Sequence, residues 1–195
     1  ASSQFMVFNW NKASDPFKQS LFRSDKFRRA MSHLVNRQAV IDIVYGGLGI
    51  PMYSSVYPVL TQWINPKVPK YEYDPKQAAK LLAELGFTKK DREGYLVDSK
   101  GRRIEFNLAT NAGNTQREQI AKLIVDEAKK VGVKVNFQAI DFNTLVGQLL
   151  SSGPDRPFDA IIIGLTGGGL DWPFGSNVVP CKGNLHMWNK SGQCL

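Results

Sequence analysis

The stretch IEFNLATNAGNTQREQIAKLIVDEAKKVGVKVNFQA, residues 104–139, decides the fold of this chain. Apolar and polar residues alternate over 103–110 and again over 133–140, which is typical of β-strands. Between them, apolar residues recur at helical spacing from about Thr115 and stop at Gly132. A strand, a helix and a strand within about forty residues predict a right-handed βαβ unit with parallel strands.

The same pattern repeats further along, with a short helix at 143–150 and an apolar strand near 158–165. The chain is therefore predicted to be an α/β protein with an open sheet, and such sheets bind ligands beyond the carboxyl ends of their strands. The glycine-rich loop at 164–172 lies at that edge, and bare backbone there lets a ligand come close. We interpret it as a binding loop, with Trp172 facing the ligand; the alternative is a strained turn with Trp172 as core filler.

The first half of the chain carries clear helix start and stop signals. Ser24 and Asn36 are typical helix caps, and Asp74 before a proline predicts a third helix, which ends at Gly86. Residues 48–73 are rich in proline and tyrosine without a sustained period, so a long irregular excursion is expected there.

Composition limits the function classes. The 195 residues are 43% hydrophobic and 22% charged, which suits one globular domain, and no apolar run is long enough to span a bilayer. A net charge of +8 suits nucleic acid or another acidic partner. The basic spots are short and interrupted, and no zinc-finger, RNP or zipper pattern accompanies them. A solvated basic face is the preferred interpretation, with a nucleic-acid module as an alternative.

The motifs of common enzyme classes are absent from the sequence. The glycines fit neither a phosphate loop nor the complete dinucleotide fingerprint, because Trp172 stands where the third glycine belongs. With two histidines and no G-x-S-x-G elbow, no nucleophile and base pair is evident, and Asp171 lacks a second carboxylate. We expect no catalytic residue, metal or cofactor; a peptidase-like or sugar-processing enzyme domain is kept as an alternative.

Both cysteines fall in the last fifteen residues. Cys181 and Cys194 are thirteen positions apart with Gly183 and Gly192 between them, so they could close a surface loop worth about 3 kcal/mol. Two unrelated thiols are the first alternative, and a metal site with His186 is the second, although three ligands fall short of a tetrahedral zinc site. We expect the disulfide, which implies an oxidising compartment.

The order of segments resembles that of the extracytoplasmic solute-binding proteins of oligopeptide and dipeptide ABC transporters, solute-binding family 5. The resemblance covers nearly the whole chain, and it is specific as a combination rather than in any single motif. The matching segments are FNWNKASDPF (8–17), SDKFRRAMSHLVNRQAVIDIVYGGLGIP (24–51), YDPKQAAKLLAELGF (73–87), the helix at 115–131 with VGVKVNFQAIDFNTL (131–145), and FDAIIIGLTGGGLDWP (158–173).

The resemblance implies a periplasmic-binding-protein type II-like fold, an open mixed sheet with helices on both faces. Residues 1–195 then form a single domain, the larger carboxyl-terminal lobe of a two-lobed receptor, while the other lobe, the signal peptide and the returning tail are expected outside this chain. FMVFNWN (5–11) resembles the incoming hinge strand. The ligand-binding residues expected in this lobe are Asn9, Gly164, Leu165, Thr166, Gly167, Gly168, Gly169, Asp171 and Trp172.

By the same resemblance, the receptor captures a peptide or another small solute in the interlobe cleft and delivers it to a membrane permease and its ATPase. It is expected to be a periplasmic or cell-surface monomer that does no chemistry and meets the membrane through the permease. A lipid anchor on a preceding segment is compatible with this, and the resemblance also favours the disulfide.

One departure from the family bears on the ligand. Peptide-binding members carry a tryptophan directly after the strand-end glycine and an aspartate four residues after it, which pairs with the peptide's α-ammonium. Here Gly164 is that glycine, Leu165 replaces the tryptophan and Gly168 replaces the aspartate. Either Asp171 takes over the amine, or the ligand is a sugar or other neutral solute stacked on Trp172. Glycine at position 168 favours the second.

Overall fold

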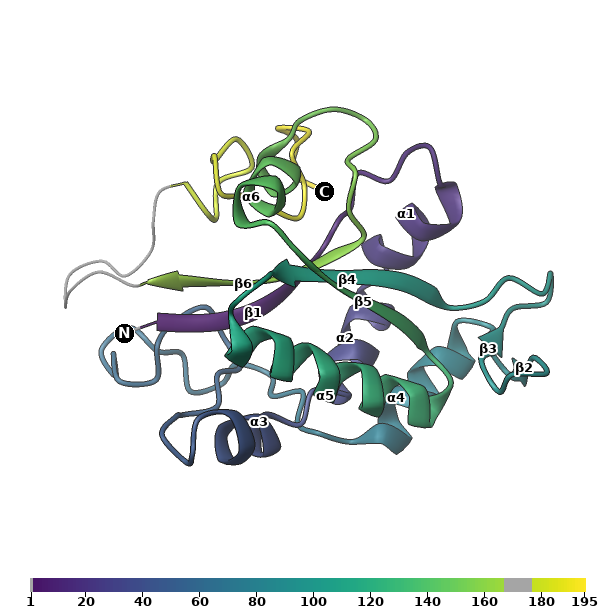
Figure 1. Ribbon diagram of the computed structural model, residues 1–195, viewed down its shortest axis with the longest axis horizontal. Helices are drawn as coiled ribbons and strands as arrows, with labels where there is room; N and C mark the ends of the chain where they lie inside the picture. The colour runs from purple at the N-terminus through teal and green to yellow at the C-terminus, as the bar shows by residue number, and fades with distance from the viewer. Residues whose placement is uncertain (1, 167–176) are drawn as a thin grey trace.

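The computed structural model describes residues 2–166 and 177–195. Its main sheet has four strands in the order β1, β6, β4, β5 (Figure 1). Strand β4 runs parallel to both β5 and β6, whereas β1 runs antiparallel to β6, so the sheet is open and mixed, as predicted. The strands are β1 (Ser2–Phe8), β4 (Glu105–Asn111), β5 (Lys134–Ile140) and β6 (Ala160–Thr166).

The predicted βαβ unit is confirmed, with boundaries one or two residues away from those expected. Helix α5 (Thr115–Val131) connects β4 to β5; the Asn114 side chain accepts a hydrogen bond from the backbone N–H of Arg117 at its start. Gly132 ends it at φ 96°, a conformation that favours glycine. Helix α6 (Phe142–Leu150) then leads from β5 to β6.

The capping signals also identify the helices of the first half. The Ser24, Asn36 and Asp74 side chains accept backbone hydrogen bonds at the starts of three helices, as predicted. A further helix, α1, was not predicted, although Asp15 caps it and a proline follows directly. These helices are α1 (Pro16–Arg23), α2 (Asp25–His33), α3 (Arg37–Val44) and α4 (Pro75–Glu84), and a small hairpin pairs β2 (Lys89–Lys90) with β3 (Leu96–Val97).

The excursion at 48–73 contains neither helix nor strand, which agrees with its irregular composition. Arg37 holds it against α2 and α3. Its guanidinium donates to the carbonyls of Met52 and Tyr71, and it lies 4.8 Å from the ring centre of Tyr53. A single half-buried cation therefore fixes two distant points of the loop.

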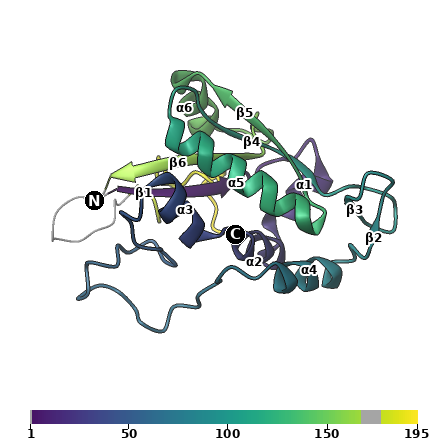
Figure 2. The ribbon, with the colours of Figure 1, turned by 60° about the horizontal axis from the view of Figure 1, so that its bottom comes forward.

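The sheet separates two hydrophobic cores, because successive side chains of a strand point to opposite faces. The helical face is the one covered by α2, α4 and α5, and the α6 face is the other (Figures 1 and 2). Leu21 and Phe22 of α1 also belong to the helical-face core. Within β6, Ala160 and Ile162 belong to the helical-face core, whereas Ile161 and Ile163 belong to the α6-face core. Helices on both faces of the sheet were predicted, and this is confirmed.

The α6 face is completed by the irregular segment 177–195, which the disulfide between Cys181 and Cys194 closes, as predicted. Beneath it lies Arg156, which is 1% exposed and donates hydrogen bonds to the backbone carbonyls of Leu149 and Met187. Burial lowers the pKa of Arg156 to about 10. This face is therefore held together by a covalent bond and a buried charge.

Candidate functional site

The predicted binding loop begins at the carboxyl end of β6. Thr166 is exposed there, and Gly164 and Leu165 are half-buried. The parallel strands β4 and β6 end at the same edge of the sheet, so residues that follow them come together. The remaining predicted positions, Gly167, Gly168, Gly169, Asp171 and Trp172, lie outside the described residues.

Polar side chains from three elements meet over this edge. Arg117, in the first turn of α5, donates from Nε to Gln4 Oε1 on β1 at 2.9 Å and from Nη1 to Asn111 Oδ1 at the end of β4 at 2.7 Å. Gln4 is in turn the pairing partner of Gly164 on β6. We call Gln4, Asn111, Arg117 and Gly164 the edge cluster. The sequence did not identify its three side chains, because only the sheet order brings them together.

Gly164 has a steric role in this cluster. A Cβ atom built on it would lie 2.8 Å from Arg117 Nη2 and 2.8 Å from the Gln4 side-chain amide. Real Cβ atoms do not approach other heavy atoms so closely, so any side chain here would push the arginine and the glutamine away. The absence of a side chain at position 164 allows Arg117 to reach across β6 to β1.

The cation of the edge cluster is only partly compensated. Arg117 forms no ion pair with a carboxylate among residues 2–166 and 177–195, and its hydrogen-bond partners are the two neutral amides. Burial lowers the pKa of Arg117, since a low-dielectric surrounding disfavours its charge. A half-buried cation held by neutral groups is suited to an anionic or strongly polar partner.

Two tyrosines lie beside the edge cluster. Tyr57, in the excursion, donates its hydroxyl to the carbonyl of Leu165 at 3.2 Å. The Tyr45 hydroxyl is buried and has no hydrogen-bond partner in the described part of the chain; burial raises the pKa of Tyr45, and the nearby charge of Arg117 opposes this. The predicted site is thus bordered by the excursion as well as by the sheet.

Asn9, the predicted ligand-binding residue of the first strand segment, lies in the interior of the lobe. It has no exposed surface, and Nδ2 donates to the carbonyls of Arg156 and Phe158 at 3.2 and 2.7 Å. Its Oδ1 accepts from the backbone N–H of Asn11 at 2.8 Å. The side chain is therefore fully engaged in joining β1 to the chain before β6, and it does not belong to the edge cluster.

The two histidines also serve structural contacts. His33 Nδ1 lies 2.6 Å from the carbonyl of Glu72, and His186 packs 4.0 Å from the Trp188 ring while contacting the carbonyl of Val178. Within the described ranges, no three His, Cys, Asp or Glu residues gather as metal ligands. In the same ranges, no helix has the length and hydropathy that crossing a bilayer requires.

The fold and the edge cluster together define a class: one α/β lobe of the periplasmic-binding-protein type II-like kind, with polar groups at the carboxyl edge of a mixed sheet. The sequence model of the bacterial extracellular solute-binding proteins, family 5 Middle, matches residues 1–183. The chain belongs to this family.

Individual relatives agree with that assignment. A Deinococcus radiodurans protein described as "Probable ABC transporter-binding protein" is 55% identical over 203 residues, which cover 100% of this chain and 34% of that protein. The oligopeptide-binding protein AppA of Bacillus subtilis is 34% identical over 163 residues, covering 82% of this chain and 28% of that protein. The chain thus spans about a third of the length of the curated relatives it matches.

A solved structure supports the fold directly. The structure of AppA from Bacillus subtilis in complex with a nonapeptide superimposes with a TM-score of 0.79 at 30% identity, covering 97% of this chain and 36% of that one. These relatives are solute-binding proteins rather than enzymes. The family resemblance inferred from the sequence is confirmed.

Proposed function

We propose that this chain is the solute-binding lobe of an ABC importer's receptor, a single domain over residues 1–195. It captures a peptide or similar small solute against a second lobe and delivers it to a membrane permease whose ATPase drives uptake. The receptor works outside the cytoplasm as a monomer and does no chemistry. The edge cluster carries this proposal, because polar groups converge where a ligand approaches a sheet of this kind.

The contacts available at the edge suit a small polar ligand. Arg117 offers a cation without a carboxylate partner in the described ranges, and Gln4 and Asn111 offer amide groups beside it. The backbone of Gly164, Leu165 and Thr166 adds hydrogen-bonding groups at a half-buried to exposed position. The AppA structure, which contains a nonapeptide, favours a peptide as the first ligand to test.

A pair of glycine substitutions tests the location of the site. In Gly164→Ala, the new methyl group displaces Arg117 and Gln4 without removing either. Gly147→Ala in α6 is the matched control, since a Cβ there meets nothing within 4 Å. We expect calorimetric titration of the complete gene product with a peptide panel to show an affinity about tenfold lower for Gly164→Ala, the loss of roughly one good polar contact. Gly147→Ala should bind as the wild type does.

Equal affinity of the two alanine variants would remove the edge cluster from the binding site. Failure of every peptide to bind, with a different solute recovered from the purified protein by native mass spectrometry, would reject the peptide ligand but not the site. The two results are therefore separable.

The ligand's charge is tested in the same titration. Asp171→Asn removes the carboxylate that could replace the family's amine anchor at Gly168. If the ligand carries no ammonium group, Asp171→Asn should leave the affinity for that ligand unchanged. N-acetylation should then not weaken the binding of any peptide in the panel. If free peptides bind tightly and acetylation or Asp171→Asn costs about 2 kcal/mol or more, Asp171 is the displaced anchor.

A further inference from the structure

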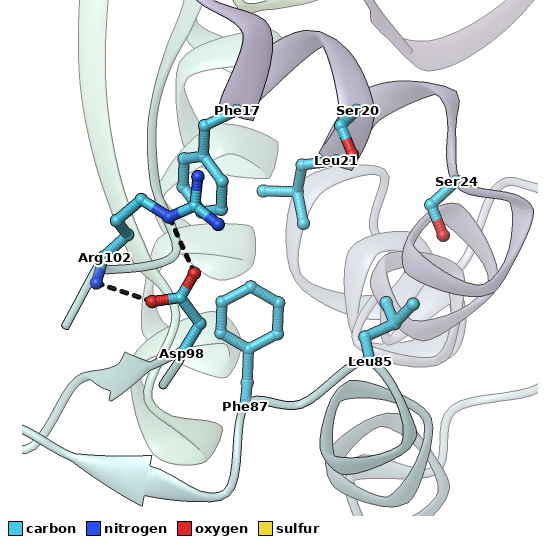
Figure 3. A pocket seen from close by; sticks show the side chains of 8 residues that line it. All are labelled: Phe17, Ser20, Leu21, Ser24, Leu85, Phe87, Asp98 and Arg102. Carbon is cyan, nitrogen blue, oxygen red and sulfur yellow. Dashed lines mark hydrogen bonds and ion pairs between the residues drawn. The ribbon is translucent and has the colours of Figure 1, made fainter. Parts of the chain in front are cut away.

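A small cavity lies at the other end of the molecule from the edge cluster. Its walls come from α1, the residues that follow α4, and the turn after β3 (Figure 3). Figure 1 places the β2–β3 hairpin and the carboxyl end of β6 at opposite ends of the long axis. The cavity measures about 150 Å³ and is lined by Phe17, Ser20, Leu21, Ser24, Leu85, Phe87, Asp98 and Arg102.

Two phenylalanines and two leucines make up the apolar half of the cavity lining, and two serines, Asp98 and Arg102 make up the polar half. Figure 3 shows the rings of Phe17 and Phe87 on one side and the Leu21 and Leu85 side chains opposite them, and the two ring centres lie 6.3 Å apart. A cavity of this volume is large enough to hold one benzene ring, and the two rings and two leucines provide its apolar contacts. The space therefore fits a single phenylalanine side chain.

Arg102 and Asp98 form the charged part of the lining. Arg102 stacks 4.4 Å from the centre of the Phe17 ring, and Asp98 holds it in place by accepting from Arg102 Nε at 2.7 Å and from its backbone N–H at 2.8 Å. On the other side, the Lys26–Glu84 ion pair at 2.9 Å joins α2 to α4 beside Leu85. The Asp98–Arg102 pair therefore orders one side of the opening, and the Lys26–Glu84 pair links the neighbouring helices.

The charge around the opening is one-sided. The carboxylates of Glu84, Asp91, Glu93 and Asp98 all form ion pairs with lysine or arginine. By contrast, four cations of the hairpin that supplies Asp98 and Arg102 have no carboxylate within ion-pair distance in the part of the chain that the structure describes; all four are exposed, namely Lys89, Lys90, Arg92 and Lys100. The surface beside the cavity thus carries uncompensated positive charge, which attracts an acidic partner.

We propose that this cavity is a docking site for an acidic protein segment that inserts one phenylalanine side chain. The ring packs against Phe17, Phe87 and the two leucines, and the flanking acidic residues face the unpaired cations of the hairpin. An apolar anchor in a pocket with a charged rim is the usual anatomy of a small protein interface. The site is independent of solute binding, since none of its residues belongs to the edge cluster.

Peptide probes and cavity-filling variants test this proposal. The probe is the acidic peptide Ac-Glu-Asp-Phe-Glu-Asp-amide, titrated into the isotope-labelled chain while backbone amide resonances are followed. We expect saturable shifts at Phe17, Leu85 and Phe87, and an affinity about tenfold lower when alanine replaces the phenylalanine of the probe. A basic probe with lysines in place of the acids should cause no shifts at these positions.

Two matched substitutions distinguish binding in the cavity from binding to the surface around it. Ser20→Phe places a ring in the cavity from α1 and should abolish the shifts. Ser14→Phe adds the same ring at an exposed position outside the cavity and should leave them unchanged. Equal binding of the phenylalanine and alanine probes, or normal binding by Ser20→Phe, would overturn the proposal.

An anionic membrane could also attract this basic surface, and it gives a distinct result. If the chain sediments with vesicles of anionic phospholipid, and Ser20→Phe sediments equally well while the acidic probe causes no shifts, the hairpin is a lipid-binding surface and the docking site is rejected.

Discussion

The two faces of the sheet are covered by different means. On the helical face, α1, α2, α4 and α5 each begin at a side chain that caps the helix, and their apolar stripes form one continuous core. On the α6 face, one short helix is completed by the irregular segment 177–195, which depends on a disulfide and on the buried Arg156. Local signals specify the helices of both faces, since Asp141 also caps α6. The irregular segment 177–195 has no such signal, and long-range bonds hold it in place.

The largest expected loss of stability comes from a substitution in the core of the helical face. Phe106 is 1% exposed, and its ring centre lies 5.3 Å from that of Phe8 and 6.0 Å from that of Phe22. Phe106→Ala should lower the free energy of unfolding by about 3–5 kcal/mol, because it removes buried apolar contacts and leaves a cavity. Urea denaturation measures this change.

Phe142→Ala is the matched control for that substitution. Phe142 is 51% exposed at the start of α6, so the same chemical change should alter stability by only about 0.5 kcal/mol. Similar losses at both positions would mean that the phenylalanine stack does not dominate the helical-face core.

A second prediction concerns the α6 face. Replacing both Cys181 and Cys194 with serine should cost about 3 kcal/mol, the chain-entropy value for a loop of this length. Hydrogen exchange should show faster exchange across 177–195, whereas amides of α5 keep their protection relative to the new global stability. Reducing agent should reproduce the effect in the wild type and have none on the variant. Uniformly faster exchange in both faces would show that the two covers are not energetically separate.

The smallest expected loss of stability concerns Asn9, which joins β1 to the segment before β6. Asn9→Ala leaves the carbonyls of Arg156 and Phe158 without their donor, and it should cost about 1–3 kcal/mol in thermal or urea unfolding. Solute affinity should stay unchanged, because Asn9 has no exposed surface. The exposed Asn143→Ala serves as the control for stability. A loss of affinity at unchanged stability would return Asn9 to the binding site.

The parts of the fold that depend on local chemistry were predictable. Ser24, Asn36 and Asp74 each cap a helix within three residues of themselves, so the sequence near them was sufficient. The βαβ unit was equally visible, since strands and helix have different hydrophobic periods. Helix α1 carries the same Asp-Pro signal at Asp15 as α4 does at Asp74, and it could have been predicted by the same argument.

The side chains of the candidate site could not be predicted in this way. Arg117 is one of several cations on α5, and its position over Gly164 follows only from the order of β1, β6 and β4 in the sheet. Gln4 is 113 residues from Arg117 along the chain. Asn9 is the opposite case, a residue that was expected to contact the ligand. Its place near the incoming strand suggested that contact, whereas its side-chain hydrogen bonds are made inside the lobe. Neither fact is encoded in a local pattern.

The antiparallel pairing of β1 with β6 also has a consequence for biosynthesis. Phe8 pairs with Ala160, so β1 has no partner in the sheet until about 150 further residues of this lobe have been made. At about 5–20 residues per second, this delay lasts roughly 10–30 s. During that time the apolar segment Phe5–Phe8 is an unpaired strand edge, the kind of surface that chaperones cover and that otherwise aggregates. Strand β1 of this lobe therefore has to remain unpaired until β6, its neighbour in the sheet, has been synthesised.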